Sequence, residues 1–349
     1  MTKTAKSMAV TPSRAYWNHR HALAEFRPRA EELQQAVDRV GDLSPCQWAQ
    51  LFVMALEFKP GLILELGRGI GNSTCVFTEA ANRLGSCSVI SMDLGDSWEK
   101  ITVPKIRKIV PPDWFQPLQA LQANILTFDF ETAFKNAGRV LLFWDAHGFD
   151  IAECVLGRIL PAIEHLPHLV IMHDMTDARY CEPKYTVPYG ENGLWKGVNA
   201  ESARMRLGHI SSAVAQAIAI VDFTSRNELN LYSADHDLHT EFGSGSSKKA
   251  ELKDLLGDEF FSLNAHWFWF SLNDMARPCT FPRYDYQEIQ TRLTMEEKIR
   301  EALELDKLMS REQVTLRLRL KIATKVLLNR YPKHFLKGII WDVVNSGPA

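Results

Sequence analysis

The chain has 349 residues, of which 46% are hydrophobic, and its formal net charge is −2 at pH 7. This length and apolar content suit one large domain with additions, or two domains. The nearly balanced charge gives no general attraction for nucleic acid and argues against a function on DNA or RNA.

Cysteine usage and the apolar runs indicate the compartment. The six cysteines are scattered without a C-x-x-C pair, which is typical of thiols in a reducing compartment rather than of disulfides or a zinc site. The sequence contains neither a signal-peptide core nor an apolar run long enough to span a membrane. We therefore expect a cytoplasmic protein.

The first expected elements are helices. The apolar spacing over residues 16–56 predicts helices interrupted at 42–45, where Ser44 followed by Pro45 is typical of a helix start. We expect residues 1–56 to form an N-terminal helical segment that packs beside the first strand.

Strands and helices then alternate along the chain. Apolar runs predict strands at residues 62–66, 89–93, about 117–122, 140–145, 169–173, 229–233 and 267–272. Such alternation predicts an α/β fold, with a doubly wound, Rossmann-like parallel sheet and helices on both faces. We expect this domain to span residues 57–278.

The most informative segment is LILELGRGIGNST at residues 62–74. Its apolar run is followed by an acid, three alternate glycines and small polar residues, including Glu65, Gly67, Gly69, Gly71 and Ser73. Glycine permits positive φ and close approach of a ligand, and the free N–H groups of a helix start favour a carboxylate or phosphate. The segment predicts a nucleotide-like cofactor site, although its spacing differs from the G-x-G-x-x-G of dinucleotide folds.

Acids and histidines follow the other predicted strands. Asp93 ends the second run, where a carboxylate can accept both hydrogen bonds of a ribose diol or simply cap the next helix. Two later strands end in Asp145, His147, His173 and Asp174. Because the carboxyl ends of parallel strands open on one edge of a sheet, we expect these side chains to converge beside the glycine turn.

These motifs resemble a known family. The E-x-G-x-G-x-G arrangement of residues 65–71 resembles motif I of the class I S-adenosylmethionine-dependent methyltransferases. The strand ends at 145–147 and 173–174 resemble the D-x-D/H … (H/D)-D signature of small O-methyltransferases of the macrocin-type, methyltransferase-24-like group. The similarity is pattern-level and covers about residues 60–275. It implies an antiparallel seventh strand and S-adenosyl-L-methionine as the cofactor.

The resemblance also implies how the cofactor is bound. Its methionine side would contact Glu65, the three glycines and Ser73. Asp93 would bind the ribose, and Asn124 would meet the adenine. Asparagine is also a common turn residue, so a turn role for Asn124 stays open. The ring of Trp98 is expected either to flank the adenine or to pack against the protein.

Methyl transfer to a hydroxyl requires removal of the hydroxyl proton, and histidine suits this role at neutral pH. His147 is the predicted base, with Asp145 beside it; alternatively, His147 only orients Asp145. A divalent cation such as Mg²⁺, held by Asp145, His173 and Asp174, could also bind the acceptor hydroxyls and lower their pKa. Many relatives have Asp where His147 stands, and they often have Asp where His173 stands, which puts the metal in doubt.

Two further segments lie outside this core. Residues 175–207 form a long connection rich in Tyr, Pro, Gly and Glu, which we interpret as a substrate lid or, alternatively, a packed insertion. Residues 279–349 are expected to form a C-terminal helical extension. Within it, residues 311–337 interleave Lys and Arg with apolar residues, which suits peripheral contact with the inner membrane, a dimer or docking interface, or packing on its own domain.

The sequence therefore predicts an S-adenosylmethionine-dependent methyltransferase that methylates oxygen in a small molecule or a sugar or glycan intermediate. Transfer to nitrogen is a close alternative, and a homo-oligomer is compatible with the sequence. A nicotinamide-dependent sugar oxidoreductase is disfavoured by the glycine spacing and by the lack of a suitably placed Tyr-x-x-x-Lys pair. A non-catalytic scaffold that binds the cofactor or a partner is a further alternative.

Overall fold

The computed structural model describes residues 10–38, 43–173 and 216–311, apart from residues 244, 266 and 276. The chain divides into two compact units, residues 1–284 and 285–349. The predicted lid, Asp174 and the basic stretch beyond Arg311 lie outside the described residues.

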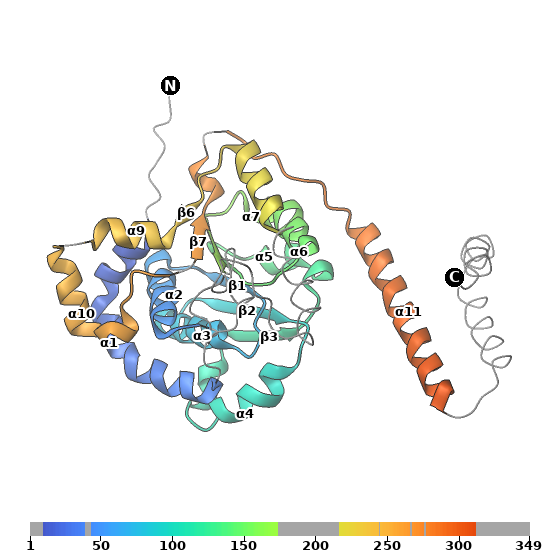
Figure 1. The fold of residues 1–349 in the computed structure, drawn as a ribbon, viewed down its shortest axis with the longest axis horizontal. Coiled ribbons are helices and arrows are strands. Elements are labelled where there is room, and N and C mark those ends of the chain that lie inside the picture. The colour runs from blue at the N-terminus through green and yellow to red at the C-terminus, as the bar shows by residue number, and fades with distance from the viewer. Residues whose placement is uncertain are drawn as a thin grey trace, which may run out of the picture. The chain divides into compact units, whose positions relative to one another are not determined.

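The first unit is built on a seven-stranded sheet with the order β3-β2-β1-β4-β5-β7-β6 (Figure 1). The strands are β1 (Leu62–Leu66), β2 (Ser88–Asp93), β3 (Leu118–Gln122), β4 (Val140–Trp144), β5 (His168–His173), β6 (Tyr232–Ser233) and β7 (Trp267–Phe270). Strands β1 to β5 are parallel, and β7 is antiparallel to β5 and β6. The predicted doubly wound sheet with an antiparallel last strand is confirmed. Its order reverses between β1 and β4, where such sheets bind ligands at the carboxyl edge.

Strand burial explains why the sequence located the strands well. β1, β4 and β5 are buried along their whole length, so each is a continuous apolar run. The sixth strand is shorter than the predicted 229–233. Residues 216–227 are helical, and the Leu229 N–H donates to the Thr224 carbonyl at 2.9 Å, so the chain is still leaving that helix when the predicted strand begins.

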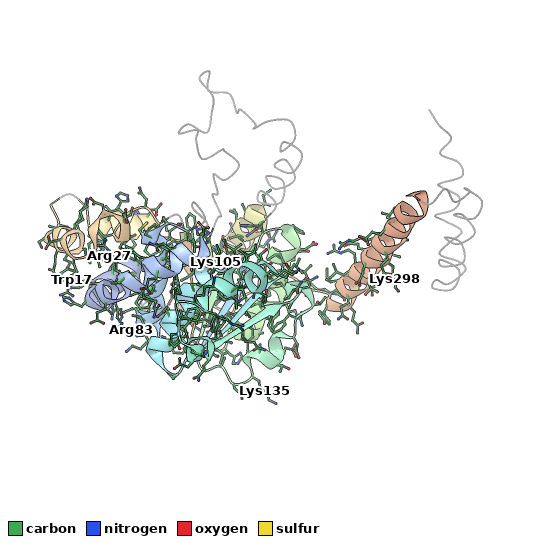
Figure 2. All side chains as sticks on the ribbon, turned by 90° about the horizontal axis from the view of Figure 1, so that it is seen from below. Trp17, Arg27, Arg83, Lys105, Lys135 and Lys298 are labelled. Carbon is green, nitrogen blue, oxygen red and sulfur yellow. The ribbon has the colours of Figure 1, made fainter. Side chains whose placement is uncertain are left out.

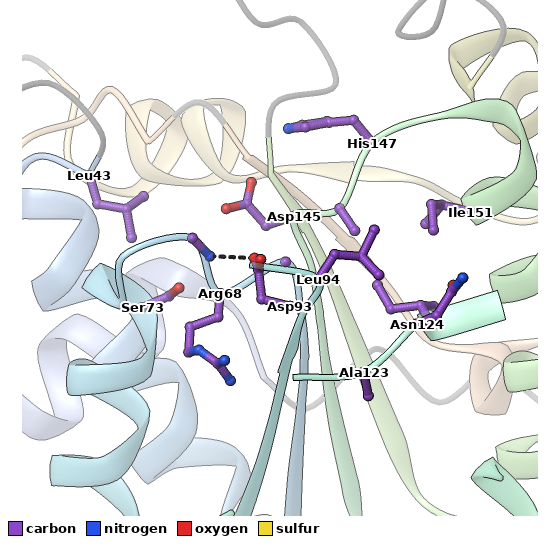
Figure 3. Close-up of a pocket in the computed structure, with 14 residues that line it drawn as sticks. Leu43, Arg68, Ser73, Asp93, Leu94, Ala123, Asn124, Asp145, His147 and Ile151 are labelled. Atoms are coloured by element: carbon purple, nitrogen blue, oxygen red, sulfur yellow. Dashed lines mark hydrogen bonds between the residues drawn. The ribbon is translucent and has the colours of Figure 1, made fainter. Parts of the chain in front are cut away.

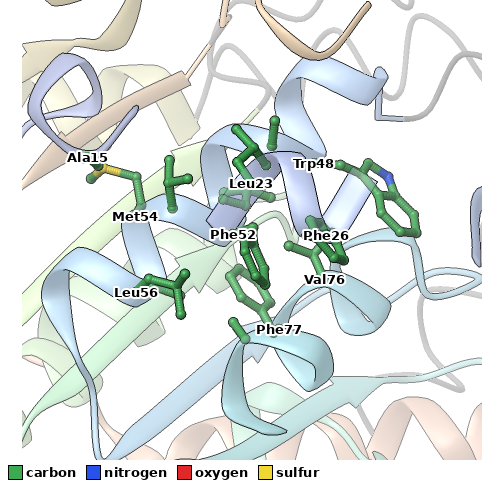
Figure 4. Packing of buried hydrophobic residues seen from close by; sticks show 14 of the residues in the cluster. Ala15, Leu23, Phe26, Trp48, Phe52, Met54, Leu56, Val76 and Phe77 are labelled. Carbon is green, nitrogen blue, oxygen red and sulfur yellow. The ribbon is translucent and has the colours of Figure 1, made fainter. Parts of the chain in front are cut away.

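One face of the sheet carries the main hydrophobic core (Figure 1). It is covered by α1 (Pro12–Val37), α2 (Pro45–Phe58), α3 (Asn72–Leu84), α9 (Ala234–Glu241) and α10 (Ser247–Phe260). Alternate strand residues such as Ile63 and Phe143 point into this core. Phe26 of α1 stacks on Phe52 of α2 with ring centroids 4.0 Å apart (Figure 4). The two N-terminal helices therefore pack as part of the first unit.

Helix α2 begins at the predicted cap. The backbone N–H of Ser44 donates to the Gln47 side-chain oxygen at 2.9 Å, and Pro45 occupies the first helical position. This pairing satisfies a backbone donor that the helix itself cannot satisfy. It also fixes the side chain of Gln47.

Shorter helical segments lie on the other face of the sheet and in the connections (Figure 1). The α-helical ones are α4 (Val103–Ile106), α5 (Phe130–Phe134), α6 (Phe149–Cys154) and α7 (Leu160–Ile163). The π-helical turns are Trp98–Thr102 and Val155–Ile159, and the 3₁₀ turns are Pro112–Phe115, Ile125–Thr127 and Leu272–Asp274.

The first unit extends past the predicted boundary at residue 278. The Thr280 N–H donates to the Asn227 side-chain oxygen at 2.7 Å, and the Tyr284 hydroxyl donates to the Leu126 carbonyl at 3.0 Å. These contacts hold the segment that follows β7 against the sheet domain. The second unit begins with α11 (Tyr286–Arg311).

Several charged side chains lie on the outside of the first unit. Figure 2 shows Arg83 and Lys135 at its edge. Arg83 pairs with Glu25, and Lys105 lies 3.5 Å from the Asp38 carboxylate. Within the described ranges, no helix has the length and apolar character needed to cross a membrane.

Candidate functional site

A pocket of about 320 Å³ opens at the carboxyl edge of the sheet, beside the switch between β1 and β4 (Figure 3). Most of the predicted site residues line it: Gly67, Gly69, Ser73, Asp93, Asn124, Asp145 and His147. The remaining lining residues are Leu43, Arg68, Leu94, Ala123, Ile125, Ala146 and Ile151. The sheet therefore brings together side chains from four strand ends, as expected from its parallel topology.

The glycine turn adopts the backbone conformation that its sequence predicts. Gly67, Gly69 and Gly71 have φ values of 94°, 56° and 100°. A Cβ on Gly67 would lie 2.7 Å from the Ala146 nitrogen, so the turn passes directly against the chain that leaves β4. Only glycine combines this conformation with this approach.

Asp93 connects the end of β2 to the glycine turn. Its Oδ2 accepts the Gly69 N–H at 2.8 Å, and its Oδ1 accepts the Gly95 N–H at 2.6 Å. A carboxylate has about four acceptor positions, so further donors can still bind the same oxygens. Asp93 is thus an oriented acceptor on the pocket wall, in the position predicted for ribose binding.

Glu65 lies beneath the turn and does not line the pocket. It is fully buried and accepts hydrogen bonds from the hydroxyls of Ser73 and Thr74, the latter at 2.6 Å. Burial raises the pKa of the Glu65 carboxyl, while these hydroxyls and the nearby Arg68 oppose the shift. In place of the expected cofactor contact, Glu65 anchors the first turn of α3.

Arg68 is a site residue that the motif analysis missed. Its guanidinium donates to the Ser91 carbonyl at 2.8 Å and the Leu121 carbonyl at 3.3 Å, and it lies 3.3 Å from the Glu99 carboxylate. The buried Nε has no hydrogen-bond partner within the described part of the chain. In Figure 3 the side chain runs below the turn. The sequence did contain a signal for Arg68, because a charged residue stands between two glycines of a tight turn.

Trp98 supports the turn from its other side. Its side chain is only 2% exposed, and a Cβ on Gly71 would lie 2.1 Å from its ring. The Thr102 hydroxyl donates to the Ile70 carbonyl at 2.6 Å. Of the two alternatives expected for Trp98, the structure shows packing against the protein, because the ring covers Gly71.

The β3 end of the pocket is formed by Asn124 and apolar neighbours. Asn124 Oδ1 accepts the Leu126 N–H at 2.9 Å and caps the 3₁₀ turn that follows, which is the alternative turn role. Leu94, Ile125 and Ile151 line the same region. Leu94 is 69% exposed, which leaves an apolar side chain at the pocket rim.

The β4 end carries the predicted catalytic residues. Asp145 and His147 both line the pocket, and Figure 3 shows their side chains at its rim. Asp145 Oδ1 lies 3.0 Å from Nδ1 of His173, and Nε2 of His173 lies 3.0 Å from Nε2 of Gln47. His173 is therefore close to the site but stands behind Asp145, outside the pocket lining.

The metal prediction finds no support in this geometry. Among the described residues, no group of three His, Cys, Asp or Glu side chains is arranged to hold a metal ion. Both ring nitrogens of His173 already face protein atoms, and Asp174 lies outside the described ranges. The divalent cation stays a prediction.

The fold and site together define a class of protein. A sheet with five parallel strands, a glycine turn after β1, an acid at the end of β2 and a pocket at the switch point is a Rossmann-like domain.

The chain matches no protein-family model and no curated protein. Solved structures to which the chain is similar include the SAH-bound methyltransferase PaMTH1 of Podospora anserina, at 14% identity and a TM-score of 0.41 over 58% of this chain and 80% of that one. The O-methyltransferase TomG of Streptomyces achromogenes, in complex with SAM, is 12% identical, with a TM-score of 0.37 over 60% of this chain and 81% of that one. An O-methyltransferase of Bacillus cereus, in complex with SAH, is 12% identical, with a TM-score of 0.35 over 60% of this chain and 82% of that one.

Proposed function

We propose that the chain is an S-adenosylmethionine-dependent methyltransferase. The observation that carries the proposal is the charge of the pocket around the glycine turn. Two carboxylates, Asp93 and Asp145, line it, whereas the guanidinium of Arg68 is buried against carbonyls and Glu99. This environment favours a cofactor with cationic groups and disfavours the diphosphate of a dinucleotide.

The order of residues along the sheet edge supports one orientation of the cofactor. Leu94, Asn124 and Ile125 would contact the adenine, and Asp93 would bind the ribose diol. The methionine half would lie at the glycine turn, beside β4 and Asp145. A pocket of about 320 Å³ is within the range of small-molecule sites.

When bound, S-adenosylmethionine supplies a methyl group that its positive sulfur makes electrophilic. The chain's own residues then position the acceptor and remove its proton. His147 would accept that proton as the acceptor oxygen attacks, and Asp145 would stabilise the positive charge that His147 acquires. An oxygen of a small molecule or of a glycan intermediate is the proposed acceptor, and an amine is the alternative.

The first experiment is calorimetric titration of the full chain with S-adenosylmethionine, S-adenosylhomocysteine and NADH. We expect micromolar binding of the first two and no binding of NADH. Binding of NADH alone would replace the proposal with an oxidoreductase. Repeating the titrations and later assays with Mg²⁺ and with EDTA tests the divalent-cation prediction.

The second experiment separates an enzyme from a scaffold. His147→Ala should abolish methyl transfer in an acceptor screen of sugars and glycan intermediates but spare cofactor binding. Asp93→Asn should weaken cofactor binding. Cofactor binding without turnover of any acceptor would favour the scaffold, and full turnover by His147→Ala would remove His147 from the mechanism.

A further inference from the structure

A chain of hydrogen bonds connects the N-terminal helix α2 to the pocket. It runs from Ser44 through Gln47 and His173 to Asp145. Gln47 and His173 are 126 residues apart in sequence, and both are buried. Asp145 is the member that reaches the pocket, where 19% of its side chain is exposed.

The contacts of Gln47 fix which end of its amide faces the histidine. The Ser44 N–H donates at 2.9 Å, so it requires the Gln47 oxygen. The Ala265 carbonyl accepts at 2.9 Å, so it requires the Gln47 nitrogen. Rotating the amide by 180° would break both bonds, so Nε2 of Gln47 must face His173 with its second N–H.

The orientation of Gln47 in turn fixes the proton on His173. Since Nε2 of His173 meets an N–H donor at 3.0 Å, it must be the acceptor and carry no proton. The ring proton of the neutral imidazole then lies on Nδ1, which donates to Asp145 Oδ1 at 3.0 Å. In this arrangement His173 presents neither a basic lone pair to an acceptor substrate nor a ligand nitrogen to a metal.

We propose that Gln47 and His173 are positioning residues that aim the Asp145 carboxylate at the cofactor pocket. The proposal rests on the proposed function, in which Asp145 lies beside the cationic half of the cofactor. A buried partner that donates to one carboxylate oxygen fixes the direction of the other, as outer-sphere partners do for active-site ligands elsewhere. Helix α2 is thereby part of the site.

The first test observes the histidine directly. The full chain is labelled with ¹⁵N-histidine, and the ring signals of His173 are assigned by their loss in His173→Asn. We expect a protonated Nδ1 and an unprotonated Nε2 at neutral pH. A proton on Nε2, alone or together with Nδ1, would overturn the hydrogen-bond chain.

The second test compares S-adenosylmethionine affinity in a graded series. Gln47→Met and His173→Leu each remove hydrogen bonds of the Ser44–Gln47–His173–Asp145 series. Each should weaken S-adenosylmethionine binding about threefold to tenfold, the usual effect of one lost hydrogen bond. His173→Asn places an amide N–H where Nδ1 donates, so it should retain more affinity than His173→Leu. A role in packing alone predicts the reverse order, because leucine suits a buried site better than asparagine does.

His168 provides a matched control at the opposite end of β5. It is 2% exposed, and its ring nitrogens contact the Leu166 carbonyl at 2.8 Å and the Leu272 N–H at 2.9 Å. His168→Leu should lower stability but leave S-adenosylmethionine affinity unchanged. Equal losses of affinity in His168→Leu and His173→Leu would mean general loosening of the domain and would overturn the positioning role.

The two experiments separate the inference from the proposed function. If the wild-type chain binds no S-adenosylmethionine, the proposed function fails, but the ring signals of His173 still decide whether the hydrogen-bond chain exists. If the cofactor binds and the series follows the packing order, the proposed function stands and the positioning role fails.

Discussion

Replacing Gly71 with alanine should distort the turn at the centre of the site. Gly71 has a φ of 100°, and an added Cβ would lie 2.1 Å from Cε3 and 2.2 Å from Cζ3 of Trp98. The ring is 2% exposed and is enclosed by the main core, so it has little room to move away. Both the backbone and the ring would have to change position.

The expected loss in the free energy of unfolding follows from these two changes. A left-handed conformation costs an alanine about 1–2 kcal/mol relative to glycine. Forcing a buried ring out of its packing adds about 1–3 kcal/mol. We therefore expect Gly71→Ala to lower the free energy of unfolding by about 2–5 kcal/mol, a large share of the stability of an ordinary domain.

Gly85→Ala is the matched control. Gly85 also has positive φ, at 71°, but an added Cβ would meet no heavy atom within 4 Å. Only the backbone cost of about 1–2 kcal/mol should then apply. Urea unfolding of the full chain, followed by tryptophan fluorescence and circular dichroism, measures both variants. Adding Trp98→Ala to Gly71→Ala should recover the steric part and give a non-additive double-mutant cycle. Equal losses in the two glycine variants, or strict additivity in the cycle, would refute the steric argument.

Three other perturbations have defined outcomes. Asp93→Asn leaves one acceptor oxygen for two backbone N–H groups and should weaken S-adenosylmethionine binding at least about tenfold in calorimetry, because hydrogen bonds to charged groups contribute about 1.5–3 kcal/mol. Glu65→Gln removes an acceptor from two buried hydroxyls and should lower the free energy of unfolding by about 1–3 kcal/mol in urea titrations. Burial lowers the pKa of His168, so the unfolded chain binds a proton first as the pH falls below about 6.5. The stability contributed by neutral His168 should be complete above that pH and decline below it, and His168→Leu should flatten this part of the pH profile.

The parallel strands were predictable because their local sequence satisfies two requirements at once. β1, β4 and β5 are buried on both faces and therefore apolar throughout. Each ends where glycine or a polar residue follows, so the boundaries were also visible. β6 was less predictable, because Leu229 is buried where the chain leaves a helix and does not pair in a strand.

The side of the turn that each residue faces was harder to predict. Glu65 and Trp98 have side chains that suit a ligand, and both lie next to the glycine turn. The structure places them beneath and behind it, where Glu65 binds hydroxyls of α3 and Trp98 covers Gly71. A motif specifies that these residues are close to the turn, but its spacing does not distinguish the ligand side from the protein side.

The supporting residues could not be predicted from the motif, since their contacts join distant segments. Arg68 reaches carbonyls within β2 and β3, and Gln47 reaches His173 from a helix that precedes the sheet. The local sequence at 62–74 thus provides the backbone that approaches a ligand, whereas its orientation depends on the segment after β2 and on α2. Transferring this glycine turn alone to another parallel sheet should therefore not transfer the site, because neither Trp98 nor the Gln47–His173 pair would accompany it.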